Sequence, residues 1–121
     1  MKPRQRKINL PIFRAEFHLA CADTIAAATQ VLPRAYHNHN KVHSNDAGLM
    51  IQDGDGGFAV LLVAEHCDLN TLAHELTHVV VDLLHRNGIK IDTDNDETAA
   101  HLMGWLMETC AATLRKWGVK L

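Results

Sequence analysis

A helical repeat of apolar residues around position 78 constrains the fold of this chain more than any other feature. Apolar side chains recur at intervals of three and four over residues 72–84, the period of a helix buried on one face. Within that stretch the pattern His-Glu-x-x-His occupies residues 74–78. A helix advances about 3.6 residues per turn, so His74 and His78 share a face. The sequence therefore predicts a helix that presents two imidazoles side by side.

This pair has the donor chemistry of a metal site. Two neutral imidazoles one turn apart can bind one Zn²⁺, and Glu75 is placed to take a proton from a water activated by that metal. With nine His and five Glu in 121 residues, about 0.03 matches to the pattern are expected by chance. The alternative is an amphipathic helix whose two histidines lie on its polar edge.

Length and charge limit the class of protein. A chain of 121 residues predicts one domain, residues 1–121. The net charge of −2 does not favour nucleic acid as a partner, and no apolar run approaches the ~20 residues of a membrane span. We expect residues 1–7 to be a flexible basic arm rather than part of a signal peptide, and the protein to be cytoplasmic. Three widely spaced cysteines suit reduced thiols.

The remaining patterns predict an α+β fold. Residues 8–21 alternate as one strand, and Asp23 is positioned to cap a helix that ends near Pro33. Residues 47–52 and 58–65 resemble a hairpin around a Gly- and Asp-rich turn, and the apolar run over residues 58–64 predicts a strand that is central or covered on both faces. The motif helix is expected to begin after a cap at Asp68 or Asn70 and to end near Gly88. With a last helix over residues 94–117, this gives about three mostly antiparallel strands packed on three helices.

A catalytic zinc has three protein ligands, so the chain must supply one more. Glu97 lies in the first turn of the last expected helix, which a short helical hairpin would bring near the metal. His101 follows one turn later and is a second candidate, either as the ligand or as a group that orients a bound imidazole. A carboxylate that only opposes the helix dipole would also explain Glu97.

At this point the chain resembles a known class of protein. The motif at residues 74–78, followed by Asn-Asp-Glu-x-x-Ala-x-x-x-Gly over residues 95–104, is similar to small zincin-like proteins of the gluzincin type. Short proteins of this kind are encoded by tailed phages and prophages. The resemblance covers mainly residues 60–110 and implies a minimal zincin-like domain.

The resemblance also implies roles for the motif residues. One Zn²⁺ would be held by His74, His78 and Glu97, with Glu75 as general base. Larger gluzincins carry an acidic residue four positions after the ligand Glu, and this chain has His101 there. They also contain a substrate-binding subdomain that 121 residues cannot include.

The polar loop before the hairpin is a candidate for contacts with substrate. Tyr36, the only tyrosine, and the histidines His37, His39 and His43 could supply the further donor that stabilises an oxyanion. Ordinary polar surface is the alternative for this loop.

Three functions follow as hypotheses. The first is a zinc-dependent metallopeptidase that hydrolyses a peptide or protein substrate, a phage or host protein, by a metal-activated water. The second is a zinc-binding assembly or interaction protein of phage origin with little turnover. The third is a metal-free helical module that binds a partner through the stripe of Trp and Met side chains at positions 103, 105, 107 and 117.

Overall fold

The computed structural model describes residues 1–38 and 47–121, and its centre is a mixed four-stranded sheet. The strands are β1 (Arg4–Asn9), β2 (Glu16–Ala22), β3 (Gly48–Gln52) and β4 (Phe58–Val63), in the order β1-β2-β4-β3. The outer pairs β1–β2 and β3–β4 are antiparallel, whereas the central pair β2–β4 is parallel. The fold is α+β as predicted, with one strand more than expected.

The extra strand comes from the N-terminal segment. Arg4 pairs with Cys21 and Asn9 with Glu16, so residues 4–9 form an edge strand where we had predicted a flexible arm. The single strand expected over residues 8–21 is likewise corrected to two strands joined by a turn. Pro11 lies in that turn, where it has no N–H for a sheet ladder, and Phe13 adopts a positive φ of 65°.

The hairpin of β3 and β4 is confirmed. The Asp53 carboxylate accepts hydrogen bonds from the backbone N–H groups of Asp55 and Gly57, each at 2.8 Å. Gly54 and Gly56 have φ of +90° and +93°, which a side chain would disfavour. Every residue of β4 is buried, as its unbroken apolar sequence predicted for a central strand.

Helix ends follow local capping chemistry. Helix α1 (Ile25–Gln30) begins one residue later than expected, because the Thr24 hydroxyl, not the Asp23 side chain, accepts from the Ala27 N–H at 3.0 Å. It is followed by a 3₁₀ turn, η1 (Arg34–Tyr36). Helix α2 (Leu69–Arg86) is capped by Asp68 and stops before Gly88, whose φ is +70°. Both ends of α2 agree with the prediction.

Helix α3 (Glu97–Lys116) begins later than the expected position 94. The polar residues before it hydrogen-bond within the link instead: Asp92 accepts from the Asp94 N–H at 3.0 Å, and Asn95 donates to the Lys90 carbonyl at 2.9 Å. These bonds favour a turn over a helix. Asp96 is the N-cap but makes no side-chain capping bond.

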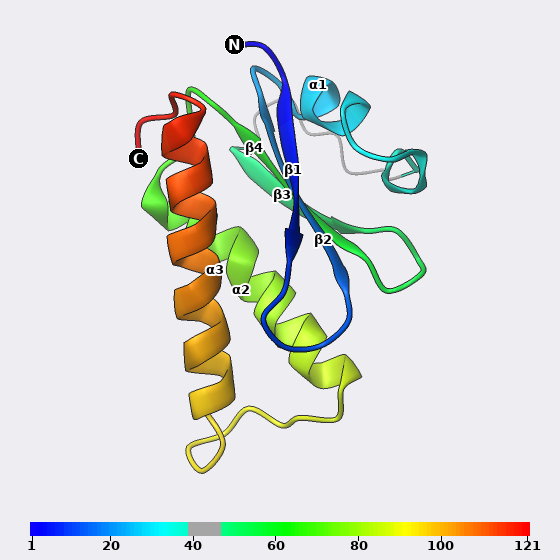
Figure 1. The fold of residues 1–121 in the computed structure, drawn as a ribbon, viewed down its shortest axis with the longest axis vertical. Helices are drawn as coiled ribbons and strands as arrows, with labels where there is room; N and C mark the ends of the chain where they lie inside the picture. Colours follow the sequence, from blue (N-terminus) through cyan, green and yellow to red (C-terminus); the bar gives the residue numbers. More distant parts are fainter. Residues whose placement is uncertain (39–46) are drawn as a thin grey trace.

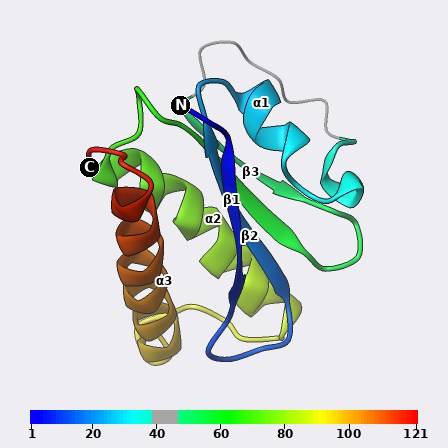
Figure 2. The ribbon, with the colours of Figure 1, turned by 45° about the horizontal axis from the view of Figure 1, so that its top comes forward.

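The sheet separates two apolar layers. Helix α1 covers one face, and α2 and α3, which pack together, cover the other (Figures 1 and 2). Side chains of β2 and β4 alternate between the layers: Leu19 and Leu62 face α2 and α3, while Ala20 and Leu61 face α1. No helix within residues 1–38 and 47–121 is long and apolar enough to cross a membrane.

Candidate functional site

The two motif histidines lie on the outer side of α2. The inner side of the helix is buried by a stripe of apolar residues that includes Leu72, Leu76 and Val79. His74 and His78 therefore point away from the core, and the His74 side chain is 68% exposed. Their ring centroids are 5.1 Å apart, with the ring planes at 79°.

This separation fits a shared metal ion. With Zn–N bonds of about 2.0–2.1 Å and tetrahedral angles, the centres of two bound imidazoles lie about 5.2 Å apart. The pair on α2 has almost that separation. Imidazole nitrogens are also ligands that zinc prefers. The separation of the two rings thus matches that of two imidazoles bound to one zinc ion.

Glu75 differs from its neighbours because it turns inward, towards the edge of the sheet. It is 8% exposed, and its Oε2 lies 3.9 Å from His74 Nε2. Its stem packs against the backbone of β3 at Gly48: a Cβ built there would stand 3.1 Å from Glu75 Cγ and 3.0 Å from Thr71 Cγ2. The carboxylate is therefore held between α2 and β3, beside the imidazole pair.

Gly48 is a site residue that the sequence analysis missed. The sequence places it at the start of a predicted strand, where a glycine often marks a close approach of backbone. What approaches it is the motif helix, which begins more than twenty residues later along the chain. The partner could not be read from the local pattern.

Further along, α2 is tied to the same edge by polar side chains. Gln52 donates a hydrogen bond to Asp82, and Arg86 donates one to Gln52. The Arg86 guanidinium also lies 4.4 Å above the centre of the Phe58 ring. These contacts fix the helix against the β3–β4 hairpin and so hold the orientation of the motif.

The proposed third ligand lies elsewhere in this structure. Glu97, in the first turn of α3, has its Oε2 at 3.2 Å from Nε2 of His101, and both side chains are more than 80% exposed. Among the described residues, no three His, Cys, Asp or Glu side chains are placed to hold a metal together. The structure thus brings His74, Glu75 and His78 together and pairs Glu97 with His101, but it does not join the two groups.

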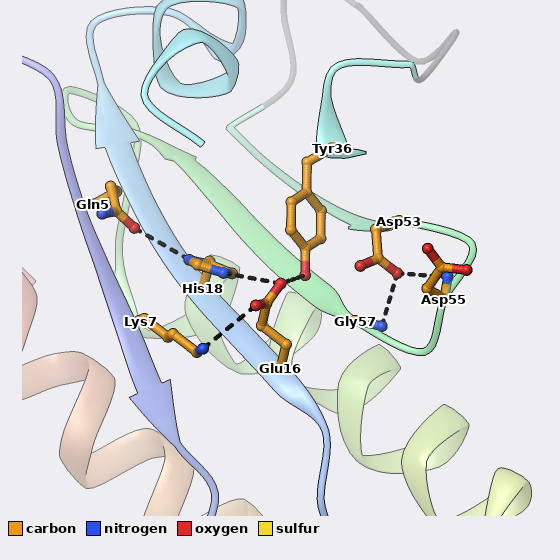
Figure 3. Close-up of polar contacts among 8 residues, drawn as sticks. All are labelled: Gln5, Lys7, Glu16, His18, Tyr36, Asp53, Asp55 and Gly57. Carbon is orange, nitrogen blue, oxygen red and sulfur yellow. Dashed lines mark hydrogen bonds and ion pairs between the residues drawn. The ribbon is translucent and has the colours of Figure 1, made fainter. Parts of the chain in front are cut away.

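Two of the loop residues expected near the substrate, Tyr36 and His37, lie away from the motif. Tyr36 is 1% exposed and belongs to the core under α1, on the opposite face of the sheet from α2. Its hydroxyl donates to Glu16 at 3.0 Å (Figure 3). His37 is engaged with the Leu32 carbonyl at 2.8 Å. His39 and His43 lie outside the described residues.

Hydrogen bonds and ion pairs connect the polar side chains around Tyr36 (Figure 3). Burial, and then the hydrogen bond to Glu16, raise the pKa of Tyr36 well above its usual range. Burial acts to raise the pKa of Glu16, but hydrogen bonds from Tyr36 and His18 outweigh it and lower that pKa. His18 is 4% exposed, with Nδ1 3.2 Å from Gln5 Oε1 and Nε2 3.2 Å from Glu16 Oε2. The cluster joins β1, β2 and η1.

The three cysteines are free and buried. Burial raises the pKa of Cys21 to about 11 and the pKa values of Cys67 and Cys110 to about 12. Thiolates are therefore scarce at neutral pH.

Comparison of the chain with known protein families, curated proteins and solved structures gave no match. The chemistry of the motif therefore has to be argued from the residues of the chain itself.

Proposed function

We propose that the chain is a minimal zincin-like, zinc-dependent metallopeptidase in which His74 and His78 bind one Zn²⁺ and Glu75 is the general base. One observation carries the proposal: two exposed imidazoles at the separation of a tetrahedral pair, with a carboxylate beside them on the same helix. Zinc, when bound, is a Lewis acid that lowers the pKa of water towards neutrality and polarises a carbonyl.

Glu75 has the surroundings that a proton carrier needs. Its stem packs against Gly48 of β3, and its Oε2 lies 3.9 Å from His74 Nε2. From there it takes a proton from the attacking water and returns it to the amine that leaves. Shielding from bulk solvent strengthens the field of the carboxylate on that proton.

The edge of the sheet supplies a place for substrate. Among the described residues, β3 has a paired neighbour on one side only, and it passes directly beside Glu75. An extended peptide adds to such an edge through main-chain hydrogen bonds. We propose that the substrate, a peptide segment of a phage or host protein, lies along β3 with its scissile bond near the imidazole pair.

Glu97 is our proposed third ligand, with His101 as the alternative. Both side chains are exposed, so little packing opposes their reorientation, and they lie on α3, which packs against α2. Metal binding would have to break their mutual contact of 3.2 Å.

Metal stoichiometry tests the metal site. We expect about one zinc per chain for the wild type, and none for His74→Ala or His78→Ala, because the remaining donors cannot hold the ion. His85→Ala is the matched control, since His85 is exposed on α2 beyond the motif, and it should keep the metal. Loss of zinc in Glu97→Ala assigns the third ligand to Glu97, whereas loss only in His101→Ala assigns it to His101. Wild-type protein that binds no zinc under any loading condition would refute the proposal.

Glu75→Gln separates the peptidase from the second candidate, a zinc-binding assembly or interaction protein with little turnover. The separation of Glu97 from the imidazole pair favours that candidate, because a catalytic zinc has three protein ligands and no three such side chains are grouped in the described residues. If the chain is a peptidase, Glu75→Gln should lower hydrolysis by roughly 10²–10⁴-fold and leave zinc content and unfolding unchanged. Equal behaviour of wild type and variant in every hydrolysis assay would favour the assembly protein.

A further inference from the structure

An apolar groove of about 300 Å³ runs between α2 and α3 next to the motif. Its lining includes Thr77, Val80, Val81, Ile91, Ala100 and Met103. The only polar side chain among them, Thr77, has its hydroxyl engaged with the Ala73 carbonyl at 2.7 Å. The groove is thus almost entirely apolar and is large enough for one aliphatic or aromatic side chain.

Its walls include apolar side chains that the fold leaves in solvent. Val81 is 48% exposed and Ile91 is 42% exposed. Of the five large apolar side chains that are exposed in the described part of the chain, these two line this one groove. Exposed apolar residues that gather at one place mark a binding surface more often than scattered ones do.

The groove borders the imidazole pair. Thr77 is three residues after His74, and Val81 is three residues after His78, so each is a helix neighbour with Cβ atoms about 5–6 Å apart. An extended peptide advances about 3.3 Å per residue. A side chain in the groove is therefore within about two residues of the peptide bond that lies over the imidazoles.

Acidic residues adjoin Ile91 and Ala100, which line the groove on the side of the link and α3. Asp92 directly follows Ile91, and Asp96 precedes Ala100 by one helical turn, with Asp94 between them in the link. These three aspartates are exposed, and none forms an ion pair within residues 1–38 and 47–121. A basic residue on a bound peptide would meet uncompensated negative charge there.

We infer that this groove holds an apolar side chain of the peptide substrate, and that the residues following it away from the imidazole pair are Lys or Arg. The apolar lining selects the first residue and the adjoining aspartates select the next ones. As an assignment of substrate class the inference rests on the proposed function, but peptide binding can be measured without turnover.

The test uses the full chain as Glu75→Gln, which cannot consume the probe by the proposed mechanism. Fluorescence anisotropy measures the binding of three labelled peptides of neutral polar sequence that differ only at the centre. The first contains Leu-Arg-Lys, the second has Gly in place of Leu, and the third has Glu-Glu in place of Arg-Lys. We expect the first to bind roughly ten- to a hundredfold more tightly than the second. The third should bind more weakly than the first, by a factor that shrinks as salt is added. Equal affinity for all three would overturn the inference and leave the groove as a gap between two helices.

Substitutions inside and outside the groove test where the peptide binds. Val81→Asp and Ala100→Leu should both reduce the preference for Leu over Gly, because the first makes the groove polar and the second fills it. Leu69→Asp is the matched control: Leu69 is 43% exposed on the same helix but does not line the groove, so its variant should bind like the parent. Leu is a strong helix former, so Ala100→Leu should fold and can test the groove even if Val81→Asp does not fold. Circular dichroism measures the folding of both variants. Equal loss of the preference in Leu69→Asp would contradict the inference.

Replacing Asp94 and Asp96 together by Asn should remove the preference for Arg-Lys over Glu-Glu without affecting the preference for Leu over Gly. Zinc content measured on the same samples separates the two proposals. One zinc per chain with no discrimination among the peptides would reject this inference alone. Discrimination without any zinc would support the groove as a peptide site and reject the metallopeptidase.

Discussion

Two groups of histidine and glutamate side chains lie on opposite faces of the same sheet, in opposite surroundings. On the α1 face, Glu16 and His18 are enclosed by Tyr36 and the side chains of β1, with a polar partner at each end. On the outer side of α2, His74 and His78 have each other and one carboxylate, and are otherwise open to solvent. Polar groups that the fold encloses contribute to its stability, whereas exposed donors remain available for a ligand.

The largest expected effects come from one substitution in each group: the first should remove metal binding, and the second should lower stability. His74→Ala should abolish zinc binding and change the free energy of unfolding by no more than about 0.5 kcal/mol, because the side chain is exposed. His18→Ala should retain zinc and lose about 1–3 kcal/mol, because it empties a buried position beside Glu16. Zinc analysis and urea unfolding on the same two proteins measure both quantities. If His18→Ala lost the metal, the two groups would not be independent.

Gly48 allows the helix and the sheet edge to approach each other, and a larger residue there should disturb the motif. In Gly48→Val the new Cβ would stand 3.0 Å from both Leu62 and Thr71 and 3.1 Å from Glu75. We expect a loss of about 1–3 kcal/mol in stability from overpacking and a fall in hydrolysis, because Glu75 is displaced. Gly104→Val is the control, since a Cβ there meets nothing within 4 Å. Full activity in Gly48→Val would show that the position of Glu75 does not depend on β3.

These sites show which parts of the structure can be predicted from sequence. The β3–β4 hairpin and both ends of α2 depend on turn residues and caps a few positions apart, so the local pattern predicts them. The imidazole pair is also local, because four residues on a helix define it.

The errors arise where distant segments meet. β1 has four polar residues in its first four positions and becomes a strand because β2 pairs with it, a contact that its own composition does not indicate. The expected convergence of Glu97 with the histidines depends on how α3 packs against α2, and the link residues 87–96 hydrogen-bond in a way that the spacing does not reveal. Pro11 is the exception, because its lack of a backbone N–H is a local signal for a turn within residues 8–21.

The Tyr36 hydroxyl connects η1 to Glu16 on the α1 face of the sheet. Tyr36→Phe removes the hydroxyl that donates to Glu16 while it keeps the buried ring. The loss of a hydrogen bond to a charged group should lower the free energy of unfolding by about 1–2 kcal/mol, measured by urea unfolding at neutral pH. Zinc content and hydrolysis should be unchanged, because the residue lies on the other face of the sheet from α2. A loss of hydrolysis in this variant would instead place Tyr36 in the reaction.

The smallest expected effect is on the stability of the fold at acid pH. The pKa of Glu16 in the folded chain is below its ordinary value of 4.5, so the unfolded chain takes up this proton first as the pH falls. The carboxylate therefore contributes stability that is fully present above about pH 4.5 and is lost as the pH falls through the folded pKa. In Glu16→Gln this contribution is absent, so the variant should be less stable at neutral pH and its stability should fall less steeply below about pH 4.5.

Asp68 provides the comparison for this measurement. Hydrogen bonds from Thr71 lower the pKa of its carboxyl at the N-cap of α2, on the other side of the sheet. Asp68→Asn keeps a capping side chain and removes that titration, so it should flatten the acid limb independently of Glu16→Gln. The double variant should then show the sum of the two changes, because the groups share no partner. If Glu16→Gln leaves the acid limb of the urea-unfolding series unchanged while Asp68→Asn flattens it, the cluster on the α1 face is not coupled to folding through the Glu16 carboxylate.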